Sequence, residues 1–110
     1  MINNVGIDII ENKRIDINDS NFINCVLTDK EIEIFKRKKG HKKIEFLCGR
    51  FTAKEAIIKA LNNENPHMKE IEILNKKNGA PFAIFKNYNI LLSISHEINY
   101  TVSIAIILNW

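Results

Sequence analysis

Apolar and polar residues alternate close to the start of the chain. Val5, Ile7 and Ile9 recur at every second position, which is the period of a β-strand. We expect a first strand that ends near Glu11, with Asp8 on the face opposite those three apolar side chains. An acidic residue inside an otherwise apolar strand is the first candidate for chemistry in the sequence.

Two helices are expected in the middle of the chain, and the first has a clear start signal. Thr28 and Glu31 have the spacing of a capping box, in which each side chain accepts a hydrogen bond from the other residue's backbone amide. We expect a helix that starts there and ends near Gly40.

A longer helix is expected over about 44–61. Glu55 falls on the same side of its helical wheel as the apolar stripe, so a carboxylate interrupts a face that should pack on the core. Such a carboxylate needs a partner. The apolar residues that define the stripe recur at spacings of four, three and seven: Ile44, Cys48, Phe51 and Ile58.

The last third of the chain has the pattern of two β-hairpins. Residues 70–74 and 81–85 read EIEIL and PFAIF, and they flank an Asn78-Gly79 turn. Residues 91–95 and 100–108 form the second pair, joined through the segment HEIN. The order of strand, helices and four strands predicts an α+β fold, with a mainly antiparallel sheet of about five strands and helices packed on one side.

Composition narrows the class of protein. The chain has 110 residues and 45% hydrophobic content, which fits one domain over residues 1–110. We expect no membrane contact, because the apolar runs are too short for a membrane-spanning helix. The N-terminus lacks the pattern of a secretory signal. The two cysteines form no disulfide framework or metal-ligand pattern, so we expect a cytoplasmic protein.

Charge favours an anionic partner. The formal net charge is +3, and much of the basic character lies in the run KRKKGHKK from Lys36 to Lys43. A basic nucleic-acid-binding module is one interpretation. Such a module would gain nothing from acidic residues in its strand and helix, because their charges repel phosphates unless a metal ion lies between them.

Asp8 and Glu55 form the most informative candidate site. A buried carboxylate is costly unless a cation or hydrogen bonds compensate it, and magnesium bound by carboxylates, water and substrate phosphates is one solution. The alternative is that Asp8 faces solvent and Glu55 pairs with Lys59, one helical turn later. Ser95 and His96 end a predicted strand, where they either reach into a cleft or lie on the surface. Spacing alone does not decide between these alternatives.

Four segments, taken together and in order, resemble the holo-acyl-carrier-protein synthases, a group of phosphopantetheinyl transferases. The combination of GxD with a hydrophobic pair and Glu, then GRFxAKEA, then SxSH, is far more specific than any one string. The matching strings are VGIDIIE at 5–11, FLCGRFTAKEAIIKAL at 46–61, NGAP at 78–81 and LLSISHEINYTVSIAII at 91–107.

The resemblance implies transfer of 4′-phosphopantetheine from coenzyme A to a serine of acyl carrier protein, in support of fatty acid biosynthesis. It implies that Asp8 and Glu55 hold magnesium on the coenzyme A pyrophosphate and that Lys59 contacts the phosphates. Either Glu55 or a metal-bound water would accept the serine proton. The remaining residues that it assigns to the coenzyme A site are Arg50, Gly79, Pro81, Ser95 and His96.

The resemblance also implies partners. Arg14, with Lys13 beside it, matches the region that docks the acidic carrier protein. The run at Lys36–Lys43 either assists docking, contacts the nucleotide 3′-phosphate, or is a solvated surface. We expect a homotrimer with each coenzyme A site between adjacent subunits, and no nucleic acid partner.

Two segments depart from the family pattern. Residues 62–70 read NNENPHMKE and lack the glycine-rich turn that follows the long helix, and Ala80 stands where the family has lysine. The loss of one cation near the nucleotide predicts weaker coenzyme A affinity unless Lys76 and Lys77 compensate for it. An inactive relative with the same fold therefore remains an alternative.

Overall fold

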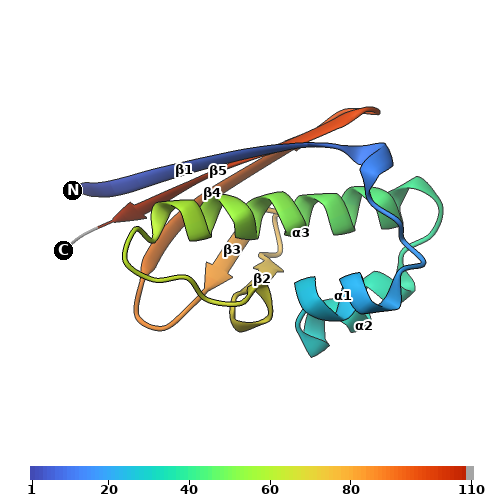
Figure 1. Cartoon of the computed structure of the whole chain (residues 1–110), viewed down its shortest axis with the longest axis horizontal. Coiled ribbons are helices and arrows are strands. Elements are labelled where there is room, and N and C mark those ends of the chain that lie inside the picture. The colour runs from blue at the N-terminus through green and yellow to red at the C-terminus, as the bar shows by residue number, and fades with distance from the viewer. Residues whose placement is uncertain (109–110) are drawn as a thin grey trace.

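The computed structural model describes residues 1–108 and has the predicted α+β architecture (Figure 1). Its helices are α1 (Ser20–Val26), α2 (Asp29–Arg37) and α3 (His41–Ala60), with short 3-10 turns at Asn12–Arg14 and Met68–Glu70. Its strands are β1 (Ile2–Glu11), β2 (Glu72–Asn75), β3 (Pro81–Ile84), β4 (Asn89–His96) and β5 (Tyr100–Leu108).

The five strands are antiparallel, as predicted, but they form two sheets and not one. β1, β5 and β4 make a three-stranded sheet in that order, and β2 and β3 make a separate hairpin. α3 lies between the three-stranded sheet and a layer made of α1, α2 and the β2–β3 hairpin (Figure 1). All three helices therefore lie on one side of the larger sheet, as the sequence predicts.

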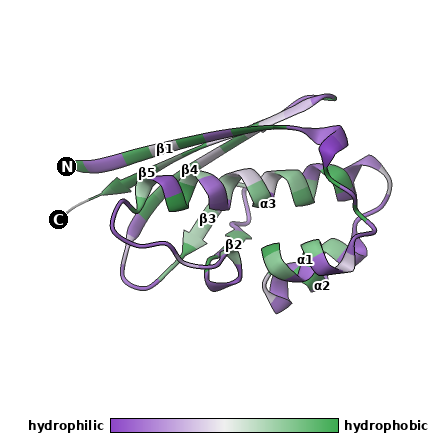
Figure 2. Ribbon diagram, viewed as in Figure 1, coloured by the Kyte–Doolittle hydropathy of each residue, from purple (hydrophilic) through white to green (hydrophobic). Residues whose placement is uncertain are grey.

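The central position of α3 explains its burial. Ala53, Ala56 and Ile57 pack with the strands in one core cluster, while Phe46 and Leu47 pack with α1 and α2 in a second. A helix covered from two sides is buried around most of its circumference. The single apolar stripe predicted for this helix therefore accounts for only part of its buried surface. Figure 2 shows apolar and polar residues alternating along the ribbon of α3.

Local start and stop signals account for the helix boundaries. The capping box is confirmed: the Thr28 amide donates to Glu31 Oε1 over 2.8 Å, and the Glu31 amide donates to Thr28 Oγ1 over 3.3 Å. Gly40 does not end α2. It has a φ of +57° and caps the start of α3, which is why α3 begins at His41, earlier than predicted. α1, capped by Asp19, was not predicted.

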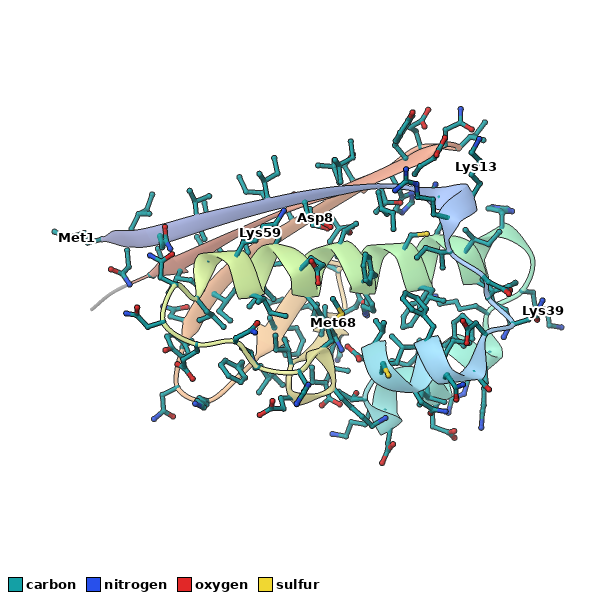
Figure 3. The ribbon with its side chains drawn as sticks, viewed as in Figure 1. Met1, Asp8, Lys13, Lys39, Lys59 and Met68 are labelled. Carbon is teal, nitrogen blue, oxygen red and sulfur yellow. The ribbon has the colours of Figure 1, made fainter. Side chains whose placement is uncertain are left out.

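The apolar side chains of β1 face away from α3. Val5, Ile7 and Ile9 are 53%, 59% and 63% exposed, and Figure 3 shows a row of side chains standing off this side of the strand. Pairing with β5 places Ile104 opposite Ile7 and Ile106 opposite Val5. We call this surface the outer apolar face. Within residues 1–108, no helix has the length and apolar character needed to cross a membrane.

Candidate active site

Gly6 brings β1 unusually close to α3. A Cβ at this position would lie 2.0 Å from the carbonyl oxygen of Ala56, so only glycine allows the two backbones to approach this closely. Asp8 lies two residues later and faces the same side of the sheet as Gly6, because successive residues of a strand face opposite sides. The contact between strand and helix therefore directs the Asp8 carboxylate toward α3.

The Asp8 carboxylate forms an ion pair with Lys59 of α3. Lys59 Nζ lies 3.1 Å from Asp8 Oδ1 and donates to the Ile7 carbonyl oxygen over 3.0 Å, and Figure 3 shows the two side chains between β1 and α3. The Asp8 side chain is only 15% exposed. The alternative interpretation, in which Asp8 faces solvent and Glu55 pairs with Lys59, is therefore wrong.

Glu55 lies one turn before Lys59 on α3, and its surroundings disfavour its charge. Partial burial raises the pKa of the Glu55 carboxyl above its ordinary value, the charge of Asp8 raises it further, and Lys59 opposes both effects. Within residues 1–108, Glu55 makes no side-chain hydrogen bond or ion pair. Two neighbouring carboxylates, one without a partner, make a site that a cation would stabilise.

The donor set suits a hard divalent cation that keeps other ligands. In the described part of the chain, no three His, Cys, Asp or Glu side chains gather at one point. A cation held by Asp8 and Glu55 would therefore complete its coordination with water or phosphate oxygens, which is the binding mode that magnesium prefers. The chemistry of the residues present fits such an ion.

A large apolar pocket borders Glu55 on α3. It encloses about 930 Å³, and Phe22, Phe51, Ile58 and Met68 contribute to its walls. α1 supplies part of this wall. No sequence pattern predicts this pocket, because the seven residues of α1 are too few to show a helical period.

A second cleft, of about 350 Å³, opens on the other side of α3. We call it the basic cleft. Four residues predicted to bind coenzyme A line it: Arg50, Gly79, Pro81 and His96. Two lysines of the basic run, Lys38 and Lys42, line it as well.

Arg50 is the buried cation of the basic cleft. It is 5% exposed, its guanidinium carbon lies 4.3 Å from the Phe46 ring centre, and its Nη2 donates to Asn75 Oδ1 over 2.8 Å. Burial lowers the pKa of the Arg50 guanidinium, and the charge of Glu31 partly offsets that effect. Its Nε lies 3.9 Å from Glu31 Oε2 and has no hydrogen-bond partner among the described residues.

Ser95 and His96 do not share one cleft. His96 lines the basic cleft, with Nδ1 3.6 Å from the Glu45 carboxylate. Ser95 is exposed and pairs with Val102 on the outer apolar face. Adjacent strand residues point to opposite faces, so within one copy of the chain the predicted pair cannot hold the same part of a ligand.

The predicted residues thus form two groups on opposite sides of α3. Glu55 and Arg50 are five residues apart, which is a rotation of about 140° around a helix axis. Asp8 lies on β1 and His96 on β4, the two edge strands of the sheet. The carboxylate site (Asp8, Glu55 and Lys59) and the basic cleft are therefore separate surfaces of one copy.

Lys13 and Arg14, the predicted docking residues, lie in the 3-10 turn that follows β1. Their side chains are 80% and 76% exposed. Lys13 Nζ and Arg14 Nε lie 3.4 Å and 3.7 Å from the Glu11 carboxylate. Both cations remain available to an acidic partner because exposed ion pairs of this kind are weak.

Comparisons with known proteins agree with one another on the family and the fold. Residues 4–106 match the model of the 4′-phosphopantetheinyl transferase superfamily. A holo-[acyl-carrier-protein] synthase of Mycoplasma capricolum is 49% identical over 96% of this chain and 94% of its own length. One of a Geobacillus species is 39% identical over 97% of each chain.

A solved structure gives the same result. The crystal structure of a holo-(acyl-carrier-protein) synthase from Bacillus anthracis, in complex with CoA (3′,5′-ADP), is 36% identical and superposes with a TM-score of 0.90. The match covers 97% of this chain and 96% of that one. Fold, motifs and relatives agree, and the chain belongs to the 4′-phosphopantetheinyl transferase superfamily.

Proposed function

We propose that the chain is a holo-[acyl-carrier-protein] synthase, which transfers 4′-phosphopantetheine from coenzyme A to a serine of apo acyl carrier protein and releases adenosine 3′,5′-bisphosphate. The observation that carries this proposal is the pairing of Asp8 on β1 with Lys59 on α3, beside an unpaired Glu55. Relatives that carry the synthase name match nearly the whole chain. The reaction would support fatty acid biosynthesis.

Magnesium would be held by Asp8 and Glu55. When bound there, the ion supplies Lewis-acid polarisation of phosphoryl oxygens and neutralises part of the diphosphate charge. Burial, and after it the charge of Asp8, raises the pKa of the Glu55 carboxyl, and the second of these effects supports the assignment because a cation between the two carboxylates would relieve their repulsion.

Glu55 and Lys59 provide the remaining chemistry. Glu55 would accept the proton of the carrier serine, since no side chain or backbone group of the described residues occupies its carboxylate and an oxygen not used by the metal is free to act as a base. Lys59 would neutralise non-bridging phosphate oxygens. Its present bonds to Asp8 and to the Ile7 carbonyl hold the ammonium group beside the carboxylate site.

The overall transfer is a displacement at phosphorus. The serine oxygen forms a bond to the phosphorus that carries pantetheine, and the bond from that phosphorus to the bridging oxygen of the nucleotide breaks. The serine proton moves to Glu55, and adenosine 3′,5′-bisphosphate leaves with the bonding electrons. The enzyme contributes position and charge. The apolar pocket beside Glu55 leaves room for the uncharged pantetheine arm.

The nucleotide would lie in the basic cleft of a neighbouring subunit. One coenzyme A molecule has its diphosphate near its nucleotide, whereas the carboxylate site and the basic cleft lie on opposite edges of the sheet in one copy. A cleft supplied by a second copy would bring the two surfaces together around one coenzyme A molecule. Lys38 and Lys42 line it, which supports contact of the basic run with the nucleotide 3′-phosphate.

The outer apolar face supports a homotrimer with sites between adjacent subunits. Val5, Ile7 and Ile9 are more than half exposed in one copy, and a contiguous apolar surface of this kind marks an interaction site. A head-to-tail arrangement around a threefold axis would close and repeat the same site three times.

Carrier docking would use Arg14 and Lys13, whose exposed cations suit an acidic partner. The two free cysteines support a reducing compartment and hence the cytoplasm.

A direct assay tests the proposed function. Apo acyl carrier protein is incubated with coenzyme A, magnesium and the protein, and the mass of the carrier is measured. We expect a gain of one phosphopantetheine group that depends on the metal and is lost in Asp8→Asn. Absence of a mass gain with every carrier tried would contradict the proposal.

A further inference from the structure

Asn75, the last residue of β2, makes two side-chain hydrogen bonds in opposite directions. Its Oδ1 accepts from Arg50 Nη2 over 2.8 Å, and its Nδ2 donates to the Gly79 carbonyl oxygen over 2.9 Å. All three residues line the basic cleft. The Asn75 amide therefore joins a cation of α3 to the turn of the β2–β3 hairpin.

Asparagine suits this position chemically. A guanidinium only donates hydrogen bonds and a backbone carbonyl only accepts them, so the connecting side chain must accept at one end and donate at the other. Aspartate would lack the donor and lysine would lack the acceptor. The requirement also fixes the orientation of the amide, because the reverse orientation would break both bonds.

Arg50 has few other constraints on its orientation. The guanidinium carbon lies 4.3 Å from the Phe46 ring centre, and a cation–π contact of this kind does not select one edge of the guanidinium. Nε lies 3.9 Å from Glu31 and has no hydrogen-bond partner among the described residues. The bond to Asn75 is the directional contact that sets which edge of the guanidinium faces the cleft.

The other wall of the cleft depends on the same amide. Gly79 has a φ of +90°, and the turn around it is closed by the Lys76 amide donating to the Ala80 carbonyl oxygen over 2.9 Å. Asn75 attaches this turn to the body of the protein through Gly79. Because Ala80 supplies no cation, the cleft relies on Arg50 and the lysines of the basic run.

We propose that Asn75 is a positioning residue for the nucleotide end of coenzyme A, which acts by locking Arg50 and the Gly79 turn into one preorganised cleft. The proposal rests on the proposed function, since it takes adenosine 3′,5′-bisphosphate as the ligand of the cleft. A preorganised cleft binds more tightly because less ordering is left to occur on binding.

Binding of adenosine 3′,5′-bisphosphate, measured by titration calorimetry, tests this role. We expect Asn75→Ala to raise the Kd about tenfold, because ordering the Arg50 side chain and the Gly79 turn would then have to occur on binding. The KM for coenzyme A should rise by a similar factor while kcat stays near the wild-type value. Asn87→Ala makes the same substitution in the β3–β4 connection, outside the cleft, and should change neither constant. Circular dichroism checks that each variant folds.

A double-mutant cycle separates positioning from direct contact. If Asn75 acts through Arg50, Asn75→Ala should cost much less in an Arg50→Met background than in the wild type. A full tenfold loss in that background would mean that Asn75 does not act through Arg50, and it would overturn the joint role whether Asn75 binds the nucleotide directly or acts through the Gly79 turn alone. An unchanged Kd in the wild-type background would also overturn the proposal. Failure of the wild type to bind the nucleotide would instead contradict the proposed function.

Discussion

Lys54 Nζ lies 2.6 Å from Glu31 Oε1, and neither side chain is exposed to solvent. The same carboxylate accepts from the backbone amides of Thr28 and Ile73, each over 2.8 Å. One buried glutamate thus joins the start of α2, the middle of α3 and β2. Burial lowers the pKa of the Lys54 ammonium, and the Glu31 charge is the main effect that opposes this.

Removal of one partner should be costly. We expect Lys54→Met to lower the free energy of unfolding by about 3 kcal/mol, because the buried Glu31 charge then keeps only Arg50, whose Nε lies 3.9 Å away, as a cationic partner. Urea denaturation measures the change. Lys36→Met removes an exposed ion pair with Glu33 and should change stability by less than about 1 kcal/mol. Equal effects of the two substitutions would contradict the role of the buried pair.

Gly6 should tolerate no side chain. A Cβ there would lie 2.0 Å from the Ala56 carbonyl oxygen, so Gly6→Ala should separate β1 from α3 and cost more than about 3 kcal/mol, beyond the usual cost of overpacking. The matched substitution is Gly49→Ala on α3, whose Cβ would lie 3.5 Å from Ile94. It should be neutral or stabilise by up to about 1 kcal/mol. Thermal denaturation of the two variants and the wild type measures these changes. A Gly6→Ala variant that melts at the wild-type temperature would contradict the close contact between β1 and α3.

Glu55 should destabilise the metal-free protein at neutral pH. Folding raises the pKa of its carboxyl above the ordinary value of 4.5, so the folded state binds more protons and stability falls as pH rises through the raised pKa. Below pH 4.5 the carboxyl is protonated in both states and the penalty is absent. We expect Glu55→Gln to melt at a higher temperature than the wild type at pH 7 in chelator, and at the same temperature near pH 4. A lower melting temperature at pH 7 would contradict the account.

A lysine at position 80 should strengthen coenzyme A binding. Ala80 lies between Gly79 and Pro81 at the rim of the basic cleft, so Ala80→Lys should lower the KM for coenzyme A about two- to fivefold, as one exposed charge does, with kcat unchanged. The gain should shrink at high salt. Asn87→Lys adds the same charge away from the cleft and serves as the control. If the KM for coenzyme A does not fall, the absence of a lysine at position 80 does not weaken binding.

Much of the fold could be predicted from local patterns. The capping box at Thr28, the turn at Asn78-Gly79 and the two-residue period of the strands each depend on neighbouring residues only. α1 lacked such a pattern, since seven residues with one capping aspartate give little periodicity. The division of the strands into two sheets depends on tertiary packing, which no local pattern reports.

The site was predicted in part for the same reason. Motif resemblance proposes Asp8, Glu55 and Lys59 as site residues, and the structure places Asp8 against Lys59, but the sequence does not state which carboxylate Lys59 contacts. The hydrogen-bond partners of the buried Lys54 and Arg50 side chains come from α2 and β2, far away in the chain. Pairs of this kind become visible only when the fold brings them together.

Subunit complementation tests the central claim, that one active site takes its carboxylates from one copy and its nucleotide cleft from another. Asp8→Asn disables the first half and Arg50→Met the second. Each variant alone should add no phosphopantetheine to the carrier. Co-expression of the two variants should recover about one quarter of the wild-type activity, because random assembly in the proposed trimer joins two intact halves at that fraction of the interfaces. A mixture that stays as inactive as either variant alone would contradict the shared site.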